Sequence, residues 1–227
     1  MHDSIPYFTA REGERDTSDR ALKLLKSFVG TVQLAYADET PEDRSDQGVL
    51  LARMSQCLDE ASQPTGDPVW KHVNYARQRE CMTGMLCHYC KGEPSRTDQG
   101  ILFLDVMVRD RRRAAKPAFP EGFITFQPPL CLPHAQEARD RCTYAQKAGG
   151  FTAMRVRDPR LYGAVGAPYQ IGAGGSLQPA KARMEIAFNH PQRAMFLATS
   201  YSVIMRGATV VDLDHELAAA GQVHHTS

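Results

Sequence analysis

Four residues with the chemistry of metal ligands occur as two closely spaced pairs. Cys87 and Cys90 are separated by two residues, and Cys131 and His134 repeat this spacing after an interval of 40 residues. Two residues of separation let one turn direct both side chains of a pair toward the same point, and thiolate and imidazole donors suit tetrahedral Zn²⁺. The pattern C-x2-C-x40-C-x2-H therefore predicts one zinc site. Because four protein ligands leave no open coordination position, it indicates a structural ion.

The residues around the two pairs predict the elements that hold them. Lys91 and Gly92 favour a knuckle-type turn after the first pair. Residues 100–108 and 122–127 are β-prone and are joined by a polar loop, which indicates a hairpin with a long connection. Residues 134–148 are compatible with a helix, which places the second ligand pair at a helix start.

Knuckle, hairpin and helix in this order are the layout of a treble-clef zinc finger. The predicted fold class is therefore α+β, with a treble-clef-like zinc finger embedded in a mixed α/β single domain. Treble-clef nucleases of the HNH type need a histidine on the hairpin, and residues 91–130 contain none. The sequence thus argues against nuclease activity of that type.

Other interpretations of the cysteines stay open. The first pair could be buried thiols or a redox pair, although a redox pair normally follows a strand and begins a helix. Cys81 is a reserve ligand, and His88 is expected to face solvent or to replace a cysteine ligand. Cys142 lies eight residues after His134, which is about 12 Å along a helix and too far to share a metal ion. We therefore expect Cys142 to be a core residue, and Cys57 has no partner at ligand spacing.

The composition is that of a globular chain without a strong charge. The 227 residues are 42% hydrophobic and carry a formal net charge of +1, which gives no general attraction to nucleic acid or anionic membranes. The N-terminus is polar and no apolar run approaches membrane-spanning length, so we expect a soluble, cytoplasmic protein that does not bind membranes. In a reducing compartment, six cysteines indicate metal ligation and buried thiols rather than disulfides.

Along the chain we expect five segments. They are a flexible N-terminus (1–17), a helix and strand region (18–68), the zinc-binding treble-clef-like module (69–150), a C-terminal α+β region (151–221) and a tail (222–227). Apolar residues at helical spacing predict a helix within residues 19–29. A proline-initiated apolar run predicts a buried helix over residues 191–206.

One octapeptide occurs twice with small changes. Residues 44–51 (RSDQGVLL) and 96–103 (RTDQGILF) share five of eight residues at a separation of 52 positions. The pattern predicts one turn used twice, in which Gly48 and Gly100 adopt positive φ and a strand follows. Coincidence is the alternative, because two copies do not indicate a repeat architecture.

Weaker signals point to two further sites. One dense basic run could grip a phosphate backbone or could be a solvated loop; its charged residues are Arg109, Arg111, Arg112, Arg113 and Lys116. Asp212, Asp214 and His215 follow an apolar strand and are candidate acid–base residues, with helix capping or a solvated turn as the alternative.

Four stretches of the chain carry a resemblance to a known family. Residues 76–104, 128–142, 155–169 and 205–214 resemble a family of uncharacterised actinobacterial proteins, and the resemblance extends over residues 33–214. In that family the second ligand pair is usually C-x2-C, so His134 stands where a cysteine is usual. The resemblance implies the metal site and implies no activity.

Two functions are consistent with these observations. The first is a zinc-binding regulatory or interaction protein that contacts protein or nucleic acid, with structural Zn²⁺ as its cofactor. The alternative is a biosynthetic or modifying enzyme with a scaffold zinc and a pocket within residues 151–216. The enzyme would use some of the polar residues of that region, namely Arg155, Arg157, Tyr162, Tyr169, Asp212 and His215.

Overall fold

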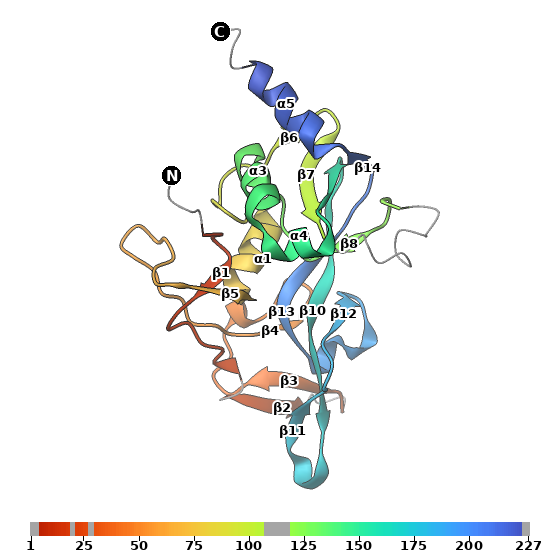
Figure 1. Cartoon of the computed structure of the whole chain (residues 1–227). Coiled ribbons are helices and arrows are strands. Elements are labelled where there is room, and N and C mark those ends of the chain that lie inside the picture. Colours follow the sequence, from red (N-terminus) through yellow and green to blue (C-terminus); the bar gives the residue numbers. More distant parts are fainter. Residues whose placement is uncertain (1–4, 19–20, 27–29, 107–118, 224–227) are drawn as a thin grey trace. The chain divides into compact units, whose positions relative to one another are not determined.

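The computed structural model describes residues 5–18, 21–26, 30–106 and 119–223, and it divides into two compact units. Unit 1 comprises residues 1–80 and 162–202, and unit 2 comprises residues 81–161 and 203–227. The elements are a mixture of helices and strands (Figure 1), which confirms the α+β class. The five-segment division of the chain stays a prediction.

Unit 1 is built mainly from strands. They are β1 (Thr9–Arg11), β2 (Leu22–Lys26), β3 (Val32–Tyr36), β4 (Leu50–Leu51), β5 (Pro68–Val73), β11 (Leu177–Pro179) and β12 (Met184–Ala187), together with most of β10 (Arg160–Ile171) and β13 (Phe196–Ile204). The unit also contains the 3₁₀ turns η2 (Pro41–Asp43), η4 (Ala173–Gly175) and η5 (Pro191–Met195) and the first part of the helix α1 (Tyr75–Gly84). Its larger sheet has the order β11-β10-β13-β4, with β12 paired to β10. Strand β4 runs parallel to β13, and β1 with β5 and β2 with β3 form antiparallel pairs.

Unit 2 contains the candidate ligands. Its elements are β6 (Arg96–Thr97), β7 (Gly100–Asp105), β8 (Ile124–Thr125), α3 (Leu132–Arg141), α4 (Thr143–Ala148), β9 (Thr152–Val156), β14 (Ala208–Val211) and α5 (Leu213–Val223). Four of the strands form an antiparallel sheet in the order β14-β9-β7-β6. Figure 1 shows α3 and α4 as green ribbons beside β7.

Strand β7 is buried on both faces, which explains its nearly continuous apolar sequence. Leu102 and Leu104 belong to one core cluster, together with Ala135 of α3. Ile101 and Phe103 point to a second cluster that also contains residues of β9. Since side chains alternate along a strand, β7 joins the two cores of unit 2.

Two helices predicted from the sequence are strands in the structure. Leu22–Lys26 pairs with Val32–Tyr36 instead of forming a helix, because the cross-strand partner outweighs a helical pattern that only Leu22 and Leu25 carry within this segment. Residues 191–206 contain η5 and β13, and most of β13 is buried. A short apolar run without alternation suits a central strand as well as a buried helix, so the pattern alone gave the wrong element.

The predicted hairpin between the two ligand pairs is also wrong for the described residues. Strand β7 pairs with β6 and β9, whereas β8 pairs with the last residues of β13. The hairpin that does form is β6–β7, with Arg96 opposite Ile101. The helix predicted over residues 134–148 is interrupted at Cys142, where α3 ends and α4 begins.

The turn that occurs twice in the sequence occurs twice in the structure. Gly48 has φ of +79° and Gly100 has φ of +114°, which confirms the predicted positive values. Each turn closes an antiparallel contact, and a strand follows each glycine. The surroundings differ: a Cβ on Gly100 would lie 2.2 Å from the carbonyl oxygen of Val156, whereas a Cβ on Gly48 would meet nothing within 4 Å.

We expect Gly100→Ala to destabilise the protein more than Gly48→Ala. Both changes place a side chain at positive φ, which costs about 1–2 kcal/mol. Gly100→Ala also forces β7 away from β9, which adds about 1–3 kcal/mol. Urea unfolding followed by circular dichroism measures both losses. Equal losses in the two variants would contradict the close approach of Gly100 to β9.

Candidate metal centre

The four ligand atoms predicted from the sequence converge in unit 2. The Sγ atoms of Cys87, Cys90 and Cys131 and a ring nitrogen of His134 all lie within 4.8 Å of one another. Cys87 Sγ lies 3.7 Å from both Cys131 Sγ and His134 Nδ1, and Cys131 Sγ lies 2.9 Å from His134 Nδ1. In tetrahedral zinc sites, bonds of about 2.3 Å to sulfur and about 2.0 Å to nitrogen place ligand atoms about 3.5–3.8 Å apart. The cluster therefore has the size of a site for one metal ion.

A tight turn presents the first pair of ligands. The backbone N–H of Cys87 donates to the Gly92 carbonyl at 2.9 Å, and the N–H of Lys91 donates back to the Cys87 carbonyl at 2.7 Å. Lys91 has φ of +59°, so the chain reverses sharply just after Cys90. This is the knuckle-type turn that Lys91 and Gly92 predicted.

The first turn of α3 presents the second pair. Cys131 occupies the position before the helix, with extended backbone, and its carbonyl accepts the N–H of Ala135 at 2.9 Å. Pro133 lies in the first helical turn, where its missing N–H costs no hydrogen bond. His134 therefore lies about one turn from Cys131, which stands at the positive end of the helix dipole.

Backbone hydrogen bonds bring the two ligand segments together. The N–H of His88 donates to the Pro129 carbonyl at 3.2 Å, and the N–H of Ser95 donates to the Leu130 carbonyl at 2.8 Å. Leu130 in turn donates its N–H to Leu102 of β7 at 3.1 Å. The residues before Cys131 are thus fixed against both the knuckle and the sheet.

The ligands range from buried to exposed. Cys87 belongs to the core cluster formed with α3, Cys131 and His134 are half-buried, and Cys90 is exposed. All six cysteines of the chain are free thiols. The centre therefore lies at the edge of a core, with one sulfur at the surface.

The sulfurs of Cys87 and Cys131 form a hydrogen bond of 3.7 Å. Their hydrogen bond lowers the pKa of Cys87 and raises the pKa of Cys131. Burial raises the pKa of Cys90. A thiol must lose its proton to bind a metal, so a divalent cation would take the place of protons that the cluster otherwise retains.

The two residues inside the first pair were misjudged or missed by the sequence analysis. His88 does not face solvent: it is 7% exposed, and its Nδ1 lies 3.0 Å from the Pro128 carbonyl and 3.2 Å from that of Pro129. Burial lowers the pKa of His88, so a neutral ring with its proton on Nδ1 donates to these carbonyls. The ring of Tyr89 stacks on that of His134, with centroids 5.2 Å apart and planes 21° apart. The sequence signal that could have indicated these contacts is the presence of two ring side chains between the cysteines of C-H-Y-C.

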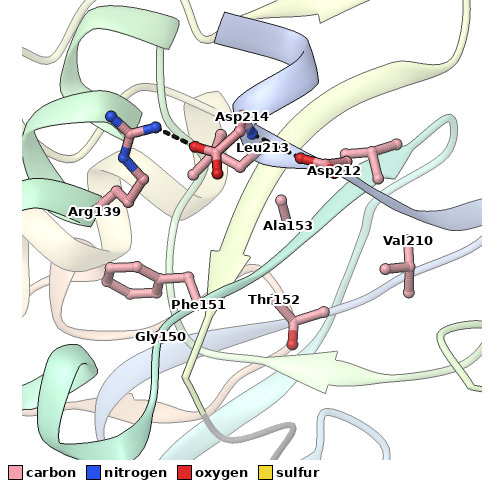
Figure 2. Close-up of a pocket in the computed structure, with 10 residues that line it drawn as sticks. Arg139, Gly150, Phe151, Thr152, Ala153, Val210, Asp212, Leu213 and Asp214 are labelled. Carbon is pink, nitrogen blue, oxygen red and sulfur yellow. Dashed lines mark hydrogen bonds and ion pairs between the residues drawn. The ribbon is translucent and has the colours of Figure 1, made fainter.

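The candidate acid–base residues lie near a separate, open hollow of about 400 Å³ (Figure 2). Asp212 and Asp214 line it together with Arg139. Asp212 Oδ1 accepts the N–H groups of Asp214 and His215 at 2.9 and 3.2 Å, so Asp212 caps α5. Asp214 forms an ion pair with Arg139. A catalytic role for Asp212, Asp214 and His215 stays a prediction.

Other predicted residues have structural partners or cannot be placed. Arg155 is fully buried, and its guanidinium contacts Ser95, the Gly100 carbonyl and Glu216 of α5. Its contacts hold β9, the β6–β7 hairpin and α5 together, so a structural role accounts for it. The basic run, with Arg109, Arg111, Arg112, Arg113 and Lys116, lies outside the described residues.

Comparisons with known proteins found no match, so the metal centre is assigned from its geometry alone. The chain matches no protein-family model, no curated protein and no solved structure. Within the described ranges, no helix has both the length and the apolar character needed to cross a bilayer.

We expect the purified protein to carry about one metal ion per chain and Cys131→Ser to lose it. With free metal 1,000-fold above its dissociation constant, loss of binding should lower the free energy of unfolding by about 4 kcal/mol. Cys142→Ser is the matched control, because the Cys142 sulfur lies outside the ligand cluster and accepts the Ala145 N–H at 3.4 Å, and serine caps helices well. Elemental analysis and thermal unfolding check both variants. Full metal content and unchanged stability in Cys131→Ser would exclude this centre.

Proposed function

We propose that the chain is a zinc-binding interaction protein whose metal ion is structural. The observation that carries the proposal is the convergence of three sulfurs and one imidazole nitrogen within 4.8 Å. Soft thiolate donors favour zinc over magnesium or calcium, and a tetrahedral set of three cysteines and one histidine is typical of structural zinc sites. Four protein donors leave no position at which the ion could activate water.

The proposed zinc module is treble-clef-like. The order of elements supports this: the knuckle at Cys87–Cys90 is followed by the β6–β7 hairpin and later by α3, whose first turn carries the last ligand. In this hairpin β7 pairs with β6 and not with the second strand that the sequence predicted, but the hairpin still follows the knuckle. Kinship with the actinobacterial family, in which a cysteine usually stands at position 134, is part of this proposal.

For the partner, the sequence favours nucleic acid over protein. Five cationic residues occur between positions 109 and 116, in the interval between the two ligand pairs. The net charge of +1 gives no general attraction, so any affinity for phosphate would come from this run. A cytoplasmic location, where thiols stay reduced, is consistent with six free cysteines.

An enzymatic function is the second candidate, and the hollow beside α5 is the observation that favours it. Asp212 and Asp214 both line that hollow, and an enzyme would need at least some of its candidate acid–base residues to line a pocket. The carboxylates are already engaged, since Asp212 caps α5 and Asp214 pairs with Arg139. The cluster of four ligand side chains is a more complete site than the hollow beside α5. We therefore place the interaction function before the enzymatic one.

Binding to a fluorescent single-stranded oligonucleotide tests the proposed partner. We expect affinity at low salt, with a negative slope of log K against log salt. Substituting glutamine for Arg111, Arg112 and Arg113 together should make this slope shallower by about 2, at about 0.7 per phosphate contact. Glutamine in place of Lys23, Lys71 and Lys147 is the control with the same charge change. Absence of binding at low salt would exclude nucleic acid and direct the search to a protein partner.

A further inference from the structure

Tyr89, which lies between the knuckle ligands Cys87 and Cys90, contacts the ligand His134 of the other segment. Tyr89 lies one residue before Cys90, whereas His134 lies in α3. Their rings are stacked, with centroids 5.2 Å apart and planes 21° apart. The knuckle therefore contributes two sulfurs and also a flat surface against the imidazole.

We propose that Tyr89 is a positioning residue of the metal centre, whose ring holds the His134 imidazole with Nδ1 toward the sulfurs of Cys87 and Cys131. The inference rests on the proposed zinc function. It assigns a role to a residue that donates no ligand atom.

The geometry of the imidazole carries the first step of this inference. Nδ1 of His134 lies 3.7 Å from Cys87 Sγ and 2.9 Å from Cys131 Sγ, so the nitrogen already faces the point at which a metal ion would bind. A histidine side chain can rotate about two bonds, and most of its rotamers turn Nδ1 away from a given point. Contact with a flat ring on one side restricts this rotation. The entropy of ordering the ligand is then lost on folding and not on metal binding, which raises affinity.

The second step is that Tyr89 is itself held in place. Its ring packs against the core cluster that contains Cys87 and Ala135. The ring of His88 also lies 5.2 Å from that of Tyr89 at an angle of 48°, and His88 Nδ1 lies within hydrogen-bond distance of the carbonyls of Pro128 and Pro129. These contacts fix the Tyr89 ring to the core and to the segment before Cys131. The Tyr89 ring in turn fixes the orientation of the His134 imidazole.

Groups that contact a metal ligand commonly change metal affinity by about 10–100-fold when they are removed. We expect Tyr89→Leu to weaken zinc binding by about this factor with the stoichiometry unchanged. Tyr89→Phe keeps the ring and should restore wild-type affinity. Tyr144→Leu, at a tyrosine of α4 that is 69% exposed, is the control for the same chemical change and should have no effect. Competition with a chromophoric chelator measures zinc affinity.

A double-mutant cycle separates orientation of the imidazole from general packing. In a His134→Cys background the fourth ligand has no ring to orient, so Tyr89→Leu should there change zinc affinity by less than about threefold. The spectrum of the Co²⁺-loaded protein provides a second readout, because its visible bands report ligand geometry. We expect Tyr89→Leu to shift these bands only when His134 is present.

Three results would overturn the inference. They are wild-type affinity in Tyr89→Leu, an equal loss of affinity in both backgrounds, and failure of Tyr89→Leu to fold in both backgrounds, since the last two show a packing role only. In each case zinc binding by the wild-type protein would stand. If the wild-type protein bound no zinc, the proposed function itself would fail, so the two failures are distinguishable.

Discussion

The convergence of two distant segments on one point is the constraint that organises unit 2. Forty residues separate Cys90 from Cys131 in the sequence, yet their sulfurs belong to one cluster no wider than 4.8 Å. Backbone hydrogen bonds from His88 to Pro129 and from Ser95 to Leu130 hold the segments in register, and the four side chains complete the junction. The ligands are therefore arranged by the fold around them, and a metal ion would reinforce contacts that already exist.

Strand β7 connects this junction to the rest of the unit. One face of β7 packs on the core that contains Cys87 and α3, and the other packs on a second core shared with β9. Gly100 at its start allows β7 to approach Val156 closely, and the buried guanidinium of Arg155 joins the same hairpin to α5. A structural change at the metal centre should therefore be transmitted through β7 to the second core, since closely packed interiors transmit strain.

The features that the sequence predicted correctly are local. The knuckle-type turn after Cys90, a turn with glycine at positive φ and a helix start at proline depend on neighbouring residues, so the turns at Lys91 and Gly48 and the helix start at Pro133 could be predicted from short patterns. Apart from the helix predicted at Leu22–Lys26, the errors concern pairing over long distances. The apolar run of β13 and the choice of β6 instead of β8 as the hairpin partner of β7 depend on strands elsewhere in the chain. The burial of His88 was missed for the same reason, since its partners lie 40 residues away.

The most direct measurement of the central claim is X-ray absorption at the zinc K-edge on the purified protein. The account predicts a first shell of three sulfurs at about 2.3 Å and one nitrogen at about 2.0 Å, with the second-shell pattern of a single imidazole. The same spectrum would contradict the account if the first shell contained only oxygen and nitrogen, or if no zinc edge remained after dialysis of the folded protein.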